Sequence, residues 1–190
     1  MQQDVERWNR KYREGNTNPD FIPDSLLTRY ASWLDGRGTA LDVACGVGHN
    51  AIFLAQRGYD VMAIDGSEAG LRYGHEAIRK TSLRIQFIAA DLKRIVLRRD
   101  FFDVVLVIRY LYRPLVAQIK RALKPGGIVI YKTFNTNQLL EKPDFKRAYL
   151  LERGELIELF SDYDVMATND SLQLEDPVSW LIARKPPPAV

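Results

Sequence analysis

The sequence predicts an α/β fold, a single doubly wound domain whose sheet is mostly parallel and ends in an antiparallel strand. Between residues 39 and 131, short apolar strands alternate with helix-like segments, as in parallel strands joined by crossover helices. After residue 155, two strand-like stretches, 163–167 and 178–183, are separated only by the short polar loop 169–176. A loop of this length favours an antiparallel hairpin over another crossover.

Strands and helix starts can be placed within this pattern. A helix is expected to begin at 23–25 and to end at Gly36, and further helices begin after Gly48 and at Pro114. Ser67 fits the N-cap of another helix, and the stretch 124–127 (KPGG) is expected to stop the helix that begins at Pro114. The strands of the alternating part are expected at 39–44, 60–65, 84–90, 102–108 and 128–131.

Composition excludes several kinds of protein. The 190 residues are 46% hydrophobic and 27% charged, and no apolar run approaches the ~18 residues of a membrane helix. The N-terminus lacks the apolar core of a secretory signal, so we expect a cytoplasmic protein. The only cysteine, Cys45, and the two histidines, His49 and His75, are too few for a disulfide or a structural zinc site, and we expect no metal. A net charge of +3 is modest for a nucleic-acid binder, and it suits a small anionic molecule.

The turn after the first strand is the first stretch that indicates a ligand. In residues 41–50 (LDVACGVGHN), Gly46 and Gly48 let the backbone turn sharply and let a ligand approach without meeting a Cβ. The spacing G-x-G-x-x-A is also a degenerate dinucleotide fingerprint. Taken alone, the pattern is also compatible with a strand-to-helix turn that binds no ligand.

Three acidic residues stand at three consecutive strand ends. Asp42 lies inside the first strand, where a carboxylate suits a cationic sulfonium or ammonium group. Asp65 ends the second strand, where it can accept both ribose hydroxyls, and Asp91 follows the third, where it can accept from an adenine amine. Open α/β sheets bind ligands at this edge, so we expect the three acids to line one nucleoside site.

These pieces together resemble the Rossmann-like, class I S-adenosylmethionine-dependent methyltransferases. The matching segments are 41–48, 63–65, 90–92, 102–105 and 123–127, in the order and spacing of the family. The resemblance implies a seven-stranded sheet with an antiparallel last strand and S-adenosylmethionine as cofactor. Ala44 departs from the family, which usually has glycine there. The expected cofactor-binding residues of the domain are Asp42, Ala44, Cys45, Gly46, Gly48, Asn50, Asp65, Gly66, Ser67, Ala90, Asp91 and Leu92.

The N-terminal stretch 7–15 looks like that of the tellurite-resistance and thiopurine-type branch of small-molecule methyltransferases. In that branch an N-terminal segment folds over the cofactor, which implies that Trp8 and Tyr12 cover the donor. The alternative is that these aromatics only dock the segment onto the core. We therefore divide the chain into a covering segment (1–38), the methyltransferase domain (39–185) and a flexible tail (186–190).

The acceptor is expected at the loop after the fourth strand. The loop lacks the Asn/Asp-Pro-Pro-aromatic motif of adenine and glutamine methyltransferases and the Pro-Cys of cytosine-C5 enzymes. Arg109, Tyr110, Tyr112 and Arg113 instead offer hydrogen-bond donors to a small anionic or electron-rich acceptor of the thiol, oxyanion or carboxylate type. Methyl transfer from a sulfonium needs alignment more than special groups. The candidate catalytic residues are Arg109, Tyr110 and His49.

Two other functions stay open at this point. A nicotinamide-dependent reductase fits the glycines and Asp65, although Asp42, Asp91 and the hairpin speak against it. A non-catalytic subunit that binds RNA or protein could use basic residues of the surface, namely Arg94, Arg98, Arg99, Lys120, Arg121 and Lys124.

Overall fold

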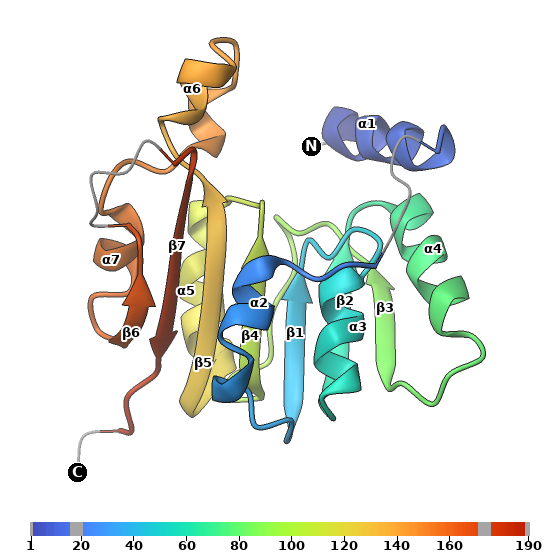
Figure 1. The fold of residues 1–190 in the computed structure, drawn as a ribbon, viewed down its shortest axis with the longest axis horizontal. Helices are drawn as coiled ribbons and strands as arrows, with labels where there is room; N and C mark the ends of the chain where they lie inside the picture. The colour runs from blue at the N-terminus through green and yellow to red at the C-terminus, as the bar shows by residue number, and fades with distance from the viewer. Residues whose placement is uncertain (1, 16–20, 171–175, 189–190) are drawn as a thin grey trace. The chain divides into compact units, whose positions relative to one another are not determined.

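The structure is a computed structural model that describes residues 2–15, 21–170 and 176–188. The chain divides into two compact units, Met1–Ile95 and Val96–Val190. Its strands follow the order β3-β2-β1-β4-β5-β7-β6 in a seven-stranded sheet (Figure 1). This order confirms the predicted sheet, because only β7 is antiparallel to its two neighbours, β5 and β6. Among the described residues, no helix is both long enough and apolar enough to cross a membrane.

Unit 1 holds three parallel strands: β1 (Thr39–Val43), β2 (Asp60–Asp65) and β3 (Ile85–Ala89). Its helices are α1 (Gln2–Arg13), α2 (Ser25–Arg29), the 3-10 helix η1 (Ala31–Trp33), α3 (His49–Gln56) and α4 (Glu68–Ile78). The β2 bounds match the prediction, and Ser67 caps α4 by accepting a hydrogen bond from the backbone N–H of Gly70. Apolar side chains of β1 such as Leu41 and Val43 are fully buried and form the centre of the core of this unit.

The predicted helix from 23–25 to Gly36 is shorter in the structure. Asp24 caps its start as expected, but the α-helix ends at Arg29 and a 3-10 turn follows. The guanidinium of Arg57 donates to the carbonyls of Ala31 and Leu34, at 2.7 and 3.1 Å. Because these carbonyls bond a side chain from α3's end, the tertiary contact holds the segment in a tighter turn than its apolar spacing predicts.

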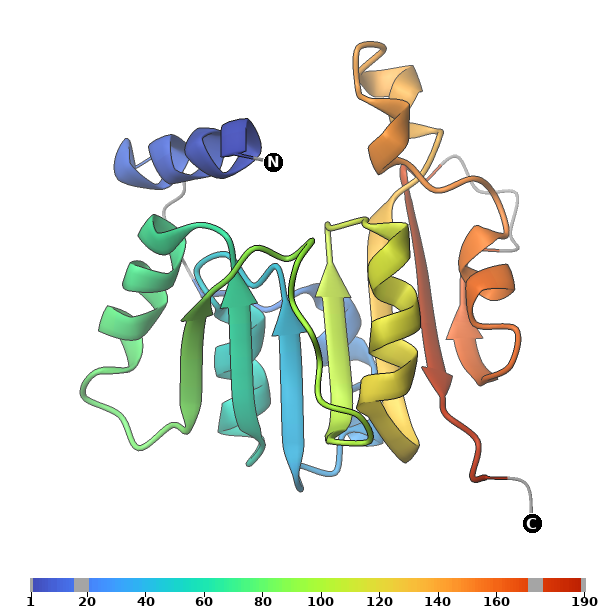
Figure 2. The ribbon, with the colours of Figure 1, turned by 180° about the vertical axis from the view of Figure 1, so that it is seen from behind.

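Unit 2 contains the strands β4 (Phe102–Ile108), β5 (Leu123–Phe134), β6 (Asp164–Thr168) and β7 (Val178–Arg184). Its helices are α5 (Arg113–Ala122), α6 (Gln138–Glu141), the 3-10 helix η2 (Arg147–Tyr149) and α7 (Glu155–Leu159). Helix α5 covers β5 on the face turned to the viewer in Figure 2. The predictions matched β4 and the start of α5, but they missed α6 and η2.

Strand β5 begins five residues earlier than predicted. Phe102 is in register with Leu123, and the register then shifts, so that Val104 faces Ile128. The KPGG stretch thus lies within the strand as an irregularity, with Gly126 at φ +80°. As predicted, the helix ends before this stretch, at Ala122, but the strand begins earlier than expected because β4 supplies a pairing edge that the local sequence does not reveal.

The predicted C-terminal hairpin is present as β6 and β7. Asn169 closes it as a backbone pair would: its Oδ1 accepts from the N–H of Trp180 and its Nδ2 donates to the carbonyl of Val178. Two predicted irregular stretches lie partly outside the described residues: the hairpin loop 169–176 and the tail 186–190.

Candidate functional site

The turn after β1 is built from residues in the left-handed region. Ala44, Gly46 and Gly48 have φ values of +58°, +58° and +80°, and α3 starts directly afterwards. A Cβ on Gly48 would lie 2.5 Å from the ring of Phe87, so this glycine serves packing against β3 as well as the turn. A Cβ on Gly46 would lie 2.5 Å from the hydroxyl of Tyr12, so α1 already approaches the main chain there.

Asp42 is a buried carboxylate without a full set of partners. Its side chain is 1% exposed, and its Oδ2 atom has no hydrogen-bond partner. Burial and the nearby carboxylate of Asp65 raise the pKa of Asp42 to about 8, against a hydrogen bond from the N–H of Ala51. An unpaired buried carboxyl oxygen is costly, so it points to a ligand that supplies positive charge or a donor.

Asp65 is oriented by the backbone on both sides. Its Oδ2 accepts from the N–H of Gly46 at 2.8 Å, and its Oδ1 accepts from the N–H of Ser67 at 2.7 Å. Burial raises the pKa of Asp65, while these backbone hydrogen bonds oppose the increase. The N–H of Gly66 acts on the carboxylate as well, and because a carboxylate has about four acceptor sites, the group can still receive a hydroxyl from a ribose.

Helix α1 packs on this turn through one face. The Oδ1 atom of Asn9 accepts from the hydroxyl of Ser67 at 2.8 Å and from the N–H of Ala69 at 3.1 Å. Val5 lies against Gly66, and burial raises the pKa of Tyr12, with Asp65 and Cys45 adding to the effect. In both ribbon views α1 lies beyond the carboxyl ends of β2 and β3 (Figures 1 and 2). The structure thus docks α1 on this turn and on the start of α4, and the covering of a cofactor by this segment stays a prediction.

The other residues predicted to bind the cofactor are placed with different local roles. Ala90 donates its N–H to the carbonyl of Asp65, whereas Asp91 accepts from the N–H of Lys93 within its own turn. Asn50 is buried and accepts from the N–H of Asp24, so it anchors the entry to α2. Trp8 is 40% exposed, its ring stacks on that of Tyr12 with centroids 5.9 Å apart, and its role over the donor stays a prediction. Leu92 and Cys45 are buried, and His49 begins α3.

The predicted acceptor residues lie in unit 2, in the connection after β4 and at the start of α5. Arg109 is exposed, has a φ of +58° and donates its N–H to the carbonyl of Lys132 at 2.7 Å. Tyr110 and Tyr112 are partly buried. The backbone N–H of Tyr112 donates to the hydroxyl of Tyr131, a buried residue whose pKa is raised by burial and by Tyr110.

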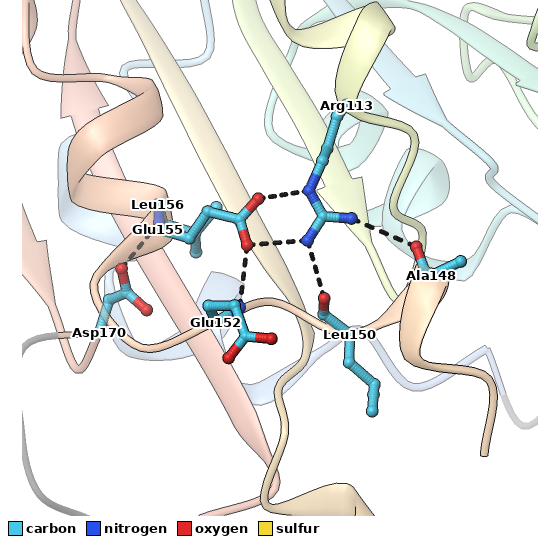
Figure 3. Close-up of polar contacts among 7 residues, drawn as sticks. All are labelled: Arg113, Ala148, Leu150, Glu152, Glu155, Leu156 and Asp170. Atoms are coloured by element: carbon cyan, nitrogen blue, oxygen red, sulfur yellow. Dashed lines mark hydrogen bonds and ion pairs between the residues drawn. The ribbon is translucent and has the colours of Figure 1, made fainter. Parts of the chain in front are cut away.

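Arg113 is engaged differently from its predicted role. Its guanidinium forms a two-point ion pair with Glu155 and also donates to the carbonyls of Leu150 and Ala148, at 2.9 and 3.3 Å (Figure 3). Glu155 in turn accepts from the N–H of Glu152 at 2.8 Å. The hydrogen bond to Glu155 raises the pKa of Arg113. With these contacts, Arg113 holds a segment of its own unit, and its role toward an acceptor stays a prediction.

Sequence reasoning missed three residues that build these sites. Asn9 follows Val5 by four residues and precedes Tyr12 by three, a helical spacing that could have revealed the docking face. Tyr131 belongs to a predicted strand, and its register with Val107 places it next to the acceptor loop. The sequence around Glu155 does not indicate its ion pair, because its partner is 42 residues away. Within the described part of the chain, no group of three or more His, Cys, Asp or Glu side chains is placed to hold a metal ion.

Comparison with known proteins agrees with this geometry. Residues 40–127 match the model of a methyltransferase domain. "Hemagglutinin 1" of Eikenella corrodens is 24% identical over 70% of this chain and 46% of its own length. The probable S-adenosyl-L-methionine-dependent methyltransferase TehB of Haemophilus influenzae is 26% identical over 70% of this chain and 48% of its own length. The chain thus spans about half the length of these curated relatives.

Solved structures show the same fold. The crystal structure of TehB from Haemophilus influenzae has a TM-score of 0.72 and 19% identity, and it covers 92% of this chain and 65% of that one. A protein solved in work on conversion of a disulfide bond into a thioacetal group during echinomycin biosynthesis has a TM-score of 0.74 and 19% identity, covering 97% and 94%. The chain therefore carries a methyltransferase domain over residues 40–127, has the Rossmann-like fold of class I S-adenosylmethionine-dependent methyltransferases, and is similar in sequence and fold to TehB.

Proposed function

We propose that the chain binds S-adenosylmethionine in unit 1 and transfers its methyl group to a small anionic or electron-rich acceptor of the thiol, oxyanion or carboxylate type. The observation that carries the proposal is the pair Asp42 and Asp65 on adjacent strand ends, next to a glycine turn. One acid has an unpaired buried oxygen and the other is aimed by two backbone N–H groups. These groups fit a ligand that carries a cation at one end and vicinal hydroxyls at the other.

The residues around the methyl donor take four roles. Asp65 accepts the ribose hydroxyls, Asp42 faces the cationic end, and the stretch 90–92 borders the adenine. Tyr12, held over Gly46 by α1, excludes water from this region. S-adenosylmethionine supplies a methyl group on a sulfonium, which is already activated toward a nucleophile.

The acceptor side is assigned to Arg109 and Tyr110. Arg109 offers an exposed guanidinium, whose planar fork suits carboxylates and oxyanions. Its left-handed backbone fixes the direction in which the side chain leaves the strand, and strained residues of this kind cluster at functional sites. Alignment and exclusion of water supply most of the acceleration in such a displacement, on the order of 7–11 kcal/mol for well-oriented reactants. Where the acceptor must lose a proton, Tyr110 and His49 are the candidate groups.

The two alternative functions are less well supported. A reductase has no use for the buried Asp42 next to its glycine turn, and a non-catalytic subunit would not need the donor residues that this chain retains. The relatives named above include a methyltransferase.

A thermal-shift experiment tests the proposal directly. A ligand that binds only the native state stabilises it by RT ln(1 + [L]/Kd), about 2.7 kcal/mol at a hundredfold excess over Kd, which corresponds to several degrees in Tm. We expect S-adenosylmethionine and S-adenosylhomocysteine to raise Tm, and NAD and NADP to leave it unchanged. A shift with NAD or NADP alone would contradict the proposal. Transfer of a labelled methyl group to a panel of one thiol, one oxyanion and one carboxylate then tests the acceptor class.

A further inference from the structure

Two interacting carboxylates of unit 1, the buried Asp42 and the partly buried Asp65, lie near the carboxyl ends of the adjacent parallel strands β1 and β2. Asp42 is 1% exposed, its Oδ2 has no partner, and the groups that act on it are the carboxylate of Asp65 and the N–H of Ala51. The backbone already occupies both oxygens of Asp65, through Gly46 and Ser67. Asp42 is therefore the member of the pair that lacks compensation for its charge.

The titratable groups around this pair come from each element packed on it. Asp65 belongs to β2, Cys45 belongs to the turn that leads into α3, and Tyr12 reaches in from α1. Burial and the acids raise the pKa of the Cys45 thiol and of the Tyr12 hydroxyl, so both stay neutral near pH 7. A second negative charge on Asp42 would thus be placed close to Asp65 in a buried site.

We propose that Asp42 exchanges a proton with solvent as the charge of the bound cofactor changes, and that it thereby distinguishes the methyl donor from the demethylated product. Asp42 is protonated in the ligand-free protein and releases its proton when the cationic donor binds. In the reaction the acceptor takes the methyl group, and the sulfur keeps the electron pair of the broken bond and becomes an uncharged thioether. The positive charge beside Asp42 is then lost, and the carboxylate takes a proton back from water. This inference rests on the proposed function, since it assigns Asp42 to the cationic end of the donor.

The expected change in the pKa of Asp42 is large enough for such an exchange. The pKa of about 8 leaves Asp42 mostly protonated at pH 7 without ligand. An opposite charge within 4–6 Å lowers the pKa of a carboxyl group by roughly 1–3 units, enough to ionise it at the same pH. Thermodynamic linkage then requires that the affinity for the donor increases as the pH rises toward 8. The affinity for the product, whose sulfur is uncharged, should increase less over the same range.

The test is calorimetric titration of S-adenosylmethionine at pH 7 in two buffers of different ionisation enthalpy, which counts released protons. Wild type is compared with Asp42→Asn, because the amino group of the ligand itself titrates near pH 8 and contributes equally to both proteins. We expect wild type to release close to one proton more than Asp42→Asn. Its affinity relative to the variant should rise by up to about tenfold per pH unit from pH 6 to 8. Asp60→Asn, the same change at the exposed opposite end of β2, should match wild type.

A second measurement uses wild type alone, in case Asp42→Asn does not fold. Both S-adenosylmethionine and S-adenosylhomocysteine carry the amino group, but only the former carries the sulfonium, so donor binding should release more protons than product binding. Equal release for the two ligands, or the same pH dependence in wild type and a folded Asp42→Asn, would overturn the inference while leaving the proposed function intact. Failure of wild type to bind either ligand would overturn the proposed function itself.

Discussion

Arg113 at the start of α5 and Glu155 at the start of α7 form a two-point ion pair across 42 residues of chain. The same guanidinium holds the carbonyls of Ala148 and Leu150, and the same carboxylate receives the N–H of Glu152 (Figure 3). The pair therefore closes the segment that runs from β5 through α6 and η2 to α7. The base of this segment is a bridge between Asn135 and Leu151. We infer that the pair keeps the end of the segment fixed on α5.

Removing either member of this pair should destabilise the protein by an amount that a double-mutant cycle can isolate. We expect a coupling free energy of about 1 kcal/mol between Arg113→Met and Glu155→Gln, because the pair is two-pronged but partly exposed and solvent screens it. Urea unfolding of the single and double variants at pH 7 measures this value. Glu158→Gln, a change of the same type in the same helix, should show no coupling with Arg113→Met.

The coupling should also depend on pH in a defined direction. Burial would raise the pKa of Glu155, but the hydrogen bonds from Arg113 and from the backbone of Glu152 lower it overall. A carboxyl group whose folded-state pKa is lowered contributes its full stability above the unfolded pKa of about 4.3 and loses it as the pH falls through the folded pKa. Urea unfolding at pH 7 and below pH 4 should therefore show the coupling decreasing in acid. A coupling that grows in acid would exclude the ion pair as its source.

Ala44 is a second test of local structure, because it has a φ of +58° in the turn after β1. A non-glycine residue in this conformation destabilises the fold by an amount on the order of 1–3 kcal/mol. Glycine relieves this strain, but it also increases the conformational entropy of the unfolded chain, which offsets part of the gain. Ala44→Gly should therefore stabilise the protein by about 1 kcal/mol and raise Tm by about 2–4 °C. The matched control Ala55→Gly, in the helical backbone of α3, should lower Tm instead. If both substitutions lower Tm, strain at Ala44 is not released by glycine.

The sequence predicted the strands of this fold better than its long-range contacts. Bounds of β2 and β4 follow from apolar runs that end in charged or glycine residues, and Ser67 follows from the chemistry of N-caps. The early start of β5 depends on pairing with Phe102, which local sequence does not encode. The ion pair of Arg113 could not be predicted from local sequence, because Glu155 is remote in sequence. In the donor region, by contrast, the positions of Asp42 and Asp65 at the ends of adjacent strands are enough to bring them together. Their proximity could therefore be predicted from the sequence.

The docking of α1 on the donor region depends on Asn9. Its Oδ1 accepts hydrogen bonds from both Ser67 and Ala69, and Ser67 is buried. Asn9→Ala should therefore increase hydrogen exchange in α1 with little change in the exchange of β1 and β2, whose ladders do not involve this contact. Arg10→Ala, at an exposed position of the same helix, is the control and should leave exchange in α1 close to wild type. Uniformly faster exchange in Asn9→Ala throughout unit 1 would show that the contact supports the whole unit.

Asp65 should contribute more to cofactor affinity than to stability. Asp65→Asn keeps an oxygen that can accept one of the two backbone hydrogen bonds, but it loses the charge that strengthens bonds from ribose hydroxyls. We expect binding of S-adenosylhomocysteine to weaken by roughly 1.5–3 kcal/mol, the usual scale for a charged hydrogen bond. Calorimetry measures the change, with Asp60→Asn as control. Unchanged affinity in a folded Asp65→Asn would place the ribose contact on another residue.

Two substitutions at Arg109 separate the effect of the side chain from the effect of the backbone conformation. Both Arg109→Ala and Arg109→Gly remove the guanidinium, but only glycine suits the φ of +58°. If the guanidinium holds the acceptor, both variants should raise KM or lower kcat/KM for the acceptor to the same extent, while cofactor affinity stays close to wild type. Arg109→Gly should also unfold at a higher temperature than Arg109→Ala, since it relieves the strain.

The alternative role for Arg109 is support of the cofactor, and the same variants distinguish it. Cofactor affinity is measured by calorimetry with S-adenosylhomocysteine, and acceptor kinetics are measured at saturating S-adenosylmethionine with the acceptor from the panel that turns over fastest. A loss of cofactor affinity in both variants, with normal acceptor kinetics at saturation, would assign the guanidinium to the cofactor. Recovery of acceptor kinetics in Arg109→Gly but not in Arg109→Ala would show that the backbone geometry of this turn matters, and not the charge.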